Sequence, residues 1–349
     1  MESPEVTGPE VTGPEATGRE VTDPEVTSPE VTSPEVTSPE VTSPEVLDPE
    51  VLDPVVVGVD GSDASLAALD WAVDEATRHG RPLRIVHASS WERYEGRVPD
   101  VSTERPSGQV LAENIVAAAV ERAGLRAPGL AVTADVVAED TSSALLREGR
   151  QAALLVVGSR GLGGLAGLLL GSVGYVVAAR ATGPVVVVRG DRYALQARHQ
   201  RILLGVGDRD VDAPAVRFAL REAAARDAEL DVVGAWRRPA HGTVGHPLPP
   251  RGPASAFEHR ASELLDDALA EAARDFPRVR IRTSTVEGPA DRVLTERSAA
   301  ADLLVVGARR RDGLVGRELG RVAHRALHHA ACPVAVVPPR QPEPLEGAP

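Results

Sequence analysis

The sequence Leu154-Leu-Val-Val-Gly-Ser-Arg-Gly161 joins a short apolar run to a glycine-rich loop, and nine residues separate it from Gly171-Ser172. The four apolar residues are typical of a strand that is buried on both faces. Glycines where a strand ends let the backbone turn sharply and approach a ligand closely. The pattern Gly-x2-Gly-x9-Gly-Ser therefore predicts a buried strand, a ligand-binding loop and a helix that begins at Gly171.

The predicted helix start at Gly171 has the chemistry of a phosphate site. Its first backbone N–H groups have no acceptor within the helix, and the helix dipole favours a negative charge there. Ser172 adds a hydroxyl donor, and Arg160 adds the positive charge that lysine provides in other phosphate loops. The loop also follows the carboxyl end of a predicted strand, which is where doubly wound sheets bind their ligands.

Apolar runs and helical patterns alternate on both sides of this stretch. The predicted strands cover residues 55–59, 83–88, 131–137, 154–157 and 185–189, and amphipathic helical segments separate them. This alternation predicts an α/β fold of the Rossmann-like, doubly wound kind, with a five-stranded parallel sheet flanked by helices.

The whole pattern then occurs a second time, at an offset of about 149 residues. Leu-Leu-Val-Val-Gly at 154–158 recurs at 303–307, and Gly-Pro-Val-Val-Val-Val at 183–188 is matched by Cys-Pro-Val-Ala-Val-Val at 332–337. We therefore predict two tandem domains, at 54–190 and 200–338, with a short linker between them.

Residues 1–53 differ in composition from the rest of the chain. They repeat with a period of five, with Pro-Glu-Val in most repeats. Regular proline interrupts both helices and strand ladders, and the glutamates repel one another. We predict a disordered acidic tail with polyproline-II character. A spacer is the simpler interpretation of the tail. Its four Ser-Pro pairs, at 28, 33, 38 and 43, make a docking or phosphorylated segment the alternative.

Charge and composition exclude several classes of protein. The net charge of −13 resides in residues 1–53, so the remainder is neutral and has no basic excess to attract nucleic acid or an anionic membrane. Cys332 is the single cysteine, which excludes an internal disulfide. We find no secretory leader and no apolar run long enough to span a bilayer, and we expect a cytoplasmic protein.

The first domain resembles the universal stress protein family. The similar stretches are Val-Val-Gly-Val-Asp-Gly-Ser at 56–62, Val-His-Ala at 86–88, Val-Val-Gly-Ser-Arg-Gly at 156–161, Gly-Ser-Val at 171–173 and Gly-Pro-Val-Val-Val-Val at 183–188. The resemblance covers residues 54–190 and, more weakly, 200–338, and the glycine pattern is that family's ATP-binding signature. It implies ATP as the ligand, with or without Mg²⁺. It also implies dimeric packing through the fifth strand, which a tandem chain can satisfy internally or extend to a homodimer.

The resemblance also implies which residues bind the nucleotide. Three would line the adenosine pocket, namely Gly58, Asp60 and Ala88. Seven would hold the ribose and the phosphates, namely Gly158, Ser159, Arg160, Gly161, Gly171, Ser172 and Val173. No catalytic residue and no metal ligand is predicted. The paired histidines at 324 and 328 fit a solvated helix face better than a zinc site, and His87 fits a core position.

The second domain departs from the signature. Gly-Ala-Arg-Arg at 307–310 replaces Gly-x2-Gly, Gly320-Arg321 replaces Gly-Ser, and Gly207 stands where the first domain has Asp60. An arginine at 310 is expected to block the close backbone approach that Gly161 permits. We therefore predict that this domain does not bind ATP in the family's manner and serves as a pseudo-dimer partner. An anion held by arginines 309, 310, 311 and 317 is the alternative.

The predicted function is that of an ATP-binding protein of stress response or regulation. No general base is evident beside the phosphate loop, and Asp60 is interpreted as a binding residue. Two alternatives stay open. One is a slow ATP hydrolase or nucleotide-dependent enzyme on the same fold, and the other is a scaffold that works through its N-terminal tail.

Overall fold

The computed structural model describes residues 52–89, 107–161, 170–237, 254–308, 310–313 and 316–339. The chain forms two compact units, Met1–Pro49 and Glu50–Pro349, and every helix and strand named below belongs to the second. The predicted tail and the loop residues 162–169 lie outside the described residues, so their predictions stay untested.

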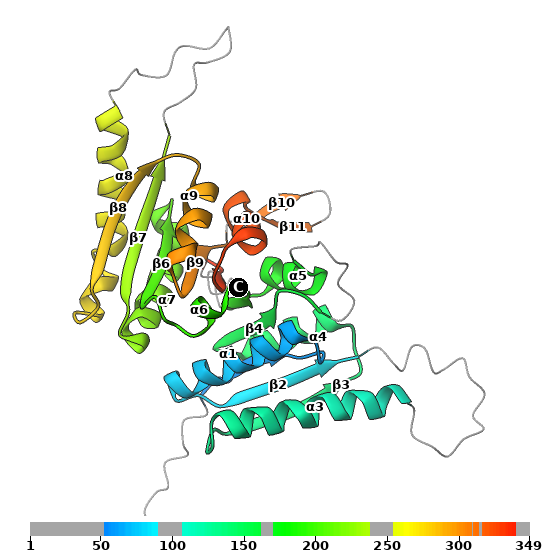
Figure 1. Ribbon diagram of the computed structural model, residues 1–349. Helices are drawn as coiled ribbons and strands as arrows, with labels where there is room; N and C mark the ends of the chain where they lie inside the picture. The colour runs from blue at the N-terminus through cyan, green and yellow to red at the C-terminus, as the bar shows by residue number, and fades with distance from the viewer. Residues whose placement is uncertain are drawn as a thin grey trace, which may run out of the picture. The chain divides into compact units, whose positions relative to one another are not determined.

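The N-terminal half alternates strands and helices as the sequence predicts (Figure 1). Its elements are β1 (Val55–Gly58), α1 (Asp63–His79), β2 (Leu83–Ala88), α3 (Ser107–Arg126), β3 (Val132–Val137), α4 (Thr141–Glu148), β4 (Leu154–Gly158), α5 (Ser172–Arg180) and β5 (Val185–Val188).

Local sequence explains where α1 begins and ends. The Ser62 side chain accepts a hydrogen bond from the Ser65 backbone N–H and caps the N-terminus. At the other end Gly80 adopts a left-handed conformation, with φ of 60°, and its N–H bonds back to the last turn. Local hydrogen bonds therefore fix both ends of the helix, which begins shortly after β1 ends.

The C-terminal half repeats this order. Its elements are α6 (Arg192–Leu195), β6 (Arg201–Val206), α7 (Arg209–Arg226), β7 (Glu229–Trp236), α8 (Ala254–Leu269), β8 (Ile281–Glu287), α9 (Ala290–Arg297), β9 (Leu303–Gly307), β10 (Arg310–Gly313), β11 (Gly316–Leu319), α10 (Arg321–His329) and β12 (Val334–Val337). Two features were not predicted. The linker carries the short helix α6, and β10 and β11 form an antiparallel hairpin where the first half has its glycine loop.

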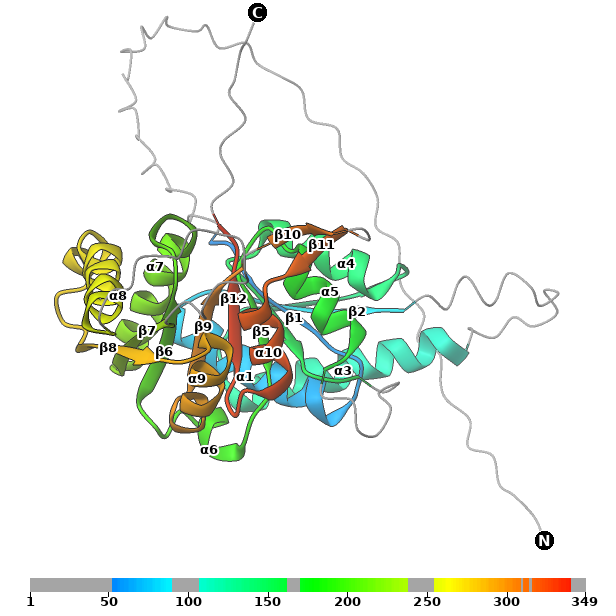
Figure 2. The same ribbon diagram turned by 90° about the horizontal axis from the view of Figure 1, so that it is seen from above.

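The two halves form one ten-stranded sheet in the order β3-β2-β1-β4-β5-β12-β9-β6-β7-β8. All neighbours are parallel except β5 and β12, which pair antiparallel in the centre with Val186 opposite Ala335 (Figure 2). The fold class is therefore confirmed as doubly wound, with five parallel strands in each half. The fifth strands pair within the chain, as the resemblance implied.

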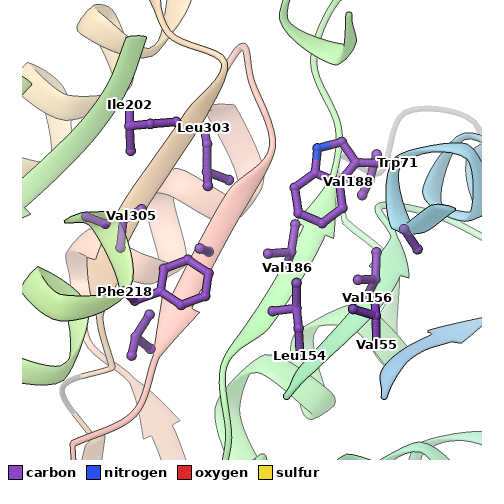
Figure 3. Packing of buried hydrophobic residues seen from close by; sticks show 14 of the residues in the cluster. Val55, Trp71, Leu154, Val156, Val186, Val188, Ile202, Phe218, Leu303 and Val305 are labelled. Atoms are coloured by element: carbon purple, nitrogen blue, oxygen red, sulfur yellow. The ribbon is translucent and has the colours of Figure 1, made fainter. Parts of the chain in front are cut away.

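Each face of the sheet has its own apolar cluster. One packs α1, α3, α7 and α8 against the strands, and Figure 3 shows it drawing side chains from both halves, among them Trp71 and Phe218. The other packs α4, α5, α9 and α10 against the opposite face and includes Cys332, which is fully buried. Because both clusters cross from one half to the other, the junction at β5 and β12 lies inside a continuous core.

None of the described helices combines the length and the apolar character needed to cross a membrane.

Candidate functional site

The carboxyl end of β1 positions Asp60 in a hydrogen-bonded turn. Its Oδ1 accepts the Ser62 backbone N–H at 3.0 Å and the Ser62 hydroxyl at 2.6 Å. Its own N–H donates to Ser65 Oγ at 3.2 Å, and Gly61 at the tip has a φ of +82°. The turn thus holds the Asp60 carboxylate at the edge of the sheet where the strands end.

Gly158 ends β4 and touches the first turn of α1. A Cβ atom at this position would lie 2.6 Å from the Ala64 carbonyl oxygen, and backbone atoms cannot move aside as a flexible side chain can. Gly58 at the end of β1 is also close-packed, because a Cβ there would lie 3.0 Å from both methyl groups of Leu145. These two glycines let the strand ends and helices converge on one edge.

Backbone hydrogen bonds hold the two ends of the glycine loop together. The Gly171 N–H donates to the Ser159 carbonyl at 2.8 Å, and the Ser159 N–H donates to Val188 at 3.1 Å. Gly161 lies against the Asp60 carboxylate, since a Cβ at 161 would overlap Oδ2. The structure therefore brings the β1 turn and the loop ends into contact. Residues 162–169 between them lie outside the described part of the chain.

The N-terminus of α5 faces this junction. Gly171 is its N-cap and provides no side-chain hydrogen bond, and the first turn contains no acidic residue. Within the described residues no side chain caps this end, so the first N–H groups can donate to an anion, and the helix dipole favours one. Ser172 is exposed in the first turn, whereas Val173 packs partly against the core.

The other two predicted residues lie at the same edge. Ala88 ends β2, and its carbonyl accepts the Thr141 hydroxyl at 3.3 Å. Arg160 is exposed on the loop. Because β2, β1 and β4 are adjacent and parallel, their carboxyl ends meet at one edge of the sheet. All ten residues named from the sequence therefore lie on this edge, and their roles stay predictions.

The corresponding edge of the C-terminal half contains a cavity of about 380 Å³. It lies where β6, β7 and β9 end and α10 begins, and its walls include Gly205, Gly207 and Ala235, the counterparts of Gly58, Asp60 and Ala88. The sequence predicted a pairing partner here, with an anion site at arginines 309, 310, 311 and 317 as the alternative. It did not indicate the cavity, because a cavity depends on packing between separate elements.

Asp212 is a second feature that sequence reasoning missed. The backbone N–H groups of Gly207 and Asp208 donate to its Oδ2 at 2.8 and 2.9 Å, and the side chain lines the cavity. In the first half Ser65 accepts the equivalent bond from Asp60. The sequence does contain a signal for this residue. When Val55 is aligned with Ile202, the first buried residues of β1 and β6, Ser65 aligns with Asp212.

A buried ionic cluster joins α1 to α7. Arg226 bonds to both Glu75, at 2.6 Å, and Glu222, while His79 lies 3.1 Å from Glu75 and 3.2 Å from Glu222. Hydrogen bonds to the two carboxylates raise the pKa of His79 to about 9. Burial alone raises the pKa of Glu222, but Arg226 and His79 outweigh it and hold that pKa well below the usual range.

Oxygen and nitrogen atoms of Glu75, His79 and Glu222 lie within 4.8 Å of one another, a spacing suited to a metal ion. Arg226 occupies both carboxylates from within the same cluster, so it already supplies the positive charge that a metal would bring. We interpret the cluster as an ion-pair network between the two halves.

His87, as predicted, is a core residue whose Nδ1 lies 2.7 Å from the Val59 carbonyl.

Comparison with known proteins agrees with the fold and with the duplication. The model of the universal stress protein family matches residues 52–189 and again 198–338. A universal stress protein of Mycolicibacterium smegmatis is 32% identical over 295 residues, which is 82% of this chain and 97% of that protein.

Solved structures show the same architecture. A universal stress protein from Archaeoglobus fulgidus aligns over 83% of this chain and 99% of its own, with a TM-score of 0.60 and 16% identity, so it supports the fold alone. A universal stress protein solved in complex with cAMP is 32% identical over 39% of this chain, with a TM-score of 0.30. The family matches cover most of both halves, and the chain therefore belongs to the universal stress protein family, with two tandem copies of its domain.

Proposed function

We propose that the N-terminal half binds ATP at the edge formed by β1, β2, β4 and α5, and that the protein acts as a nucleotide-responsive regulator in stress response. The adenosine would lie against Gly58, Asp60 and Ala88. The phosphates would lie over the loop ends at 158–161 and the start of α5. Mg²⁺ is an expected companion of the triphosphate, and the Asp60 carboxylate lies against Gly161 of the loop.

One observation supports this proposal most directly: the N-terminus of α5, which no side chain of the described residues caps, lies beside a loop whose ends are hydrogen-bonded together. Such an N-terminus presents several N–H groups to a phosphate, and the glycines at 158, 161 and 171 keep side chains out of the way. Membership of the family points the same way, because the glycine pattern is complete only in this half.

We assign no catalytic residue to this site. The Asp60 carboxylate accepts two hydrogen bonds from Ser62, which suits an orienting role better than proton abstraction. Binding and release of ATP, coupled to a change in a partner, would be enough for regulation.

Calorimetric titration of ATP into the full chain, with and without Mg²⁺, tests the proposal. We expect one site per chain. The Gly161→Arg substitution, which copies the second half's own loop, is expected to weaken binding at least a hundredfold, because its Cβ would displace the Asp60 carboxylate and its side chain would occupy the space proposed for the ligand.

Gly124→Arg is the matched control. Gly124 is exposed on α3, and a Cβ there would meet nothing within 4 Å. This variant should bind ATP like the parent. Absence of ATP binding to the parent chain, or equal binding by Gly161→Arg, would rule out the proposed site.

A further inference from the structure

Helix α3, which covers β2 and β3 at one end of the sheet, is apolar on both of its faces (Figure 1). Its inner face is buried, with Ala119 and Ala123 in the core. Its outer face exposes Leu111 by 60% and Leu125 by 78%. Among the described residues six large apolar side chains are exposed, and four of them belong to α3. A helix that is apolar on both faces normally has a partner on both.

The duplication provides an internal comparison for this face. Helix α8 is the equivalent helix of the C-terminal half, and it packs on β7 and β8 as α3 packs on β2 and β3. No large apolar side chain of α8 is exposed in the described structure. Its outer positions are mostly charged, at Glu258, Arg260, Glu263, Asp266 and Asp267. This place in the fold therefore does not require an apolar outer face, and the face of α3 points to a partner of its own.

The exposed residues of α3 follow the spacing of a helix-packing seam. Leu111, Asn114, Ala118, Glu121 and Leu125 are all exposed and follow one another at intervals of three, four, three and four residues. Intervals of this kind place side chains in one line along a helix that packs against another helix. The outer face can therefore accept a second helix along its length.

The seam is also symmetric, which identifies the second helix. Its centre lies between Ala117 and Ala118, and small side chains at the centre let two helices approach closely. If a second copy of α3 lies antiparallel with a two-fold axis at this point, Asn114 is opposite the partner's Glu121. The asparagine amide can donate a hydrogen bond to that carboxylate, and symmetry makes the contact twice.

The apolar positions match in the same alignment. Val110 is opposite the partner's Leu125, and Leu111 is opposite the partner's Gly124. Gly124 has open space around it, since a Cβ there would meet nothing within 4 Å, so the leucine has room. A face whose own residues complement one another in this way fits a second copy of the chain.

The arginines of α3 leave this face free. Arg122 donates two hydrogen bonds to Asp70 of α1, each at 2.7 Å. Arg126 donates two to Asp74 of α1, at 2.7 and 2.6 Å. Both guanidinium groups are therefore held toward α1.

We propose that the protein forms a homodimer in which the outer faces of two α3 helices pack antiparallel about a two-fold axis between Ala117 and Ala118. The family resemblance implied packing through the fifth strand, but β5 already pairs with β12 within the chain, so a second copy needs another surface. The face from Val110 to Leu125 is about 24 Å long. One helix pair is smaller than a standard interface of roughly 1,600 Å², so we expect a reversible dimer in the micromolar range.

Sedimentation velocity of the full chain, from nanomolar to high micromolar concentration, tests the proposal. We expect Leu125→Glu to weaken the dimer at least tenfold, because each dimer then places two carboxylates in apolar contacts. Tyr193→Glu is the matched control, since Tyr193 is 54% exposed but lies on α6; its dimer should equal that of the parent. Circular dichroism would verify that both variants fold.

Asn114→Lys tests the alignment by a gain. It replaces each hydrogen bond to the partner's Glu121 with an ion pair, and we expect the dimer to tighten about threefold or more. Cysteines at 110 and 125 test the direction of packing. A short bis-maleimide should link Val110→Cys to Leu125→Cys when the two proteins are mixed, and should link neither protein to itself. Cys332 is fully buried, so it does not interfere.

The dimer and the ATP site can be tested separately. Gly124→Arg should weaken the dimer while it binds ATP like the parent, and Gly161→Arg should remain dimeric. Three results would overturn the proposal: a monomer at every concentration, a dimer that neither Leu125→Glu nor Gly124→Arg weakens, and cross-links of Val110→Cys or Leu125→Cys to itself alone. None of these results bears on ATP binding by the N-terminal half.

Discussion

At the scale of single residues, the two halves differ where β1 and β6 end. Gly207 stands where the first half has Asp60, and Asp212 stands where it has Ser65, so a hydrogen-bonded carboxylate near the strand end comes from a different position in each half. In the first half the carboxylate sits in the turn after the strand, and in the second it comes from α7. The duplication has thus produced two edges of similar shape and different charge placement.

Gly158 lies at a position on this edge that has no space for a side chain. We expect Gly158→Ala to lower the free energy of unfolding by about 1–3 kcal/mol, because the added methyl group meets the Ala64 carbonyl and the Ser65 N–H. To make room for the methyl group α1 would have to move, and this movement would distort the proposed ATP site and weaken ATP binding. Urea unfolding followed by circular dichroism measures the first effect, and calorimetry the second.

Gly124→Ala is the comparison, since a Cβ there is unobstructed and alanine favours a helix. Its stability should equal or exceed that of the parent. If Gly158→Ala were as stable as the parent, the contact between β4 and α1 would be looser than the structure shows.

At the scale of elements, α1 and α7 meet through charge as well as through apolar packing. His79 on α1 lies between Glu75 of its own helix and Glu222 of α7, with Arg78 and Arg226 completing the cluster. A buried ionic network of this kind stabilises the fold only while all its members are present, because removing one member leaves others without a partner.

The raised pKa of His79 predicts how stability depends on pH. In the folded protein it is about 9, above the ordinary value of 6.5, so the charged imidazole stabilises the folded state fully below pH 6.5. This contribution is lost as the pH rises through 9. After allowance for solvent at this partly exposed ring, we expect a loss of about 1–2 kcal/mol, measured by urea unfolding at pH 6 and pH 9.5.

The His79→Gln variant keeps a hydrogen-bonding side chain and removes the titration. Its unfolding free energy should change less between these two pH values than that of the parent. An identical pH dependence in both proteins would assign the effect to another group.

At the scale of the whole folded unit, the two halves share one sheet and the two apolar clusters that cover its faces. The pairing of β5 with β12 places Val186 and Ala335, both fully buried, at the centre of ten strands. Both apolar clusters contain residues of each half. Neither half can therefore unfold without exposing the core of the other, and we expect a single cooperative transition.

Arg226→Leu tests this coupling between the halves. It removes one of the two cations that Glu75 and Glu222 share and leaves only His79 between them, and we expect a loss of about 3–5 kcal/mol. Urea unfolding should show a lower midpoint with one transition, by circular dichroism and by tryptophan fluorescence alike.

Arg217→Leu is the matched control on the same helix. Arg217 pairs with Glu271 and Asp275 on the surface, where a pair contributes about 0–1 kcal/mol. Comparable losses in the two variants would show that the buried cluster stabilises the protein no more than a surface pair.

Much of the fold could be predicted because its signals are local along the chain. Apolar runs such as 154–157 and 303–306 mark buried strands, and the repeat of the whole βα order identifies the duplication. The glycine spacing around Gly161 and Gly171 predicted a loop whose ends the structure holds together. Element bounds differed slightly, and the strand predicted at 55–59 ends at Gly58 in the structure.

By itself, the sequence determined the doubly wound class, the duplication and the half that keeps the complete glycine pattern, because each follows from residue type and spacing over short distances. Only the tertiary structure decided the antiparallel register of β5 and β12, the cluster of Glu75, His79, Glu222 and Arg226, and the cavity beside Asp212. Each of these joins residues far apart in the chain. Their meeting depends on how whole helices and strands pack, which no local pattern specifies.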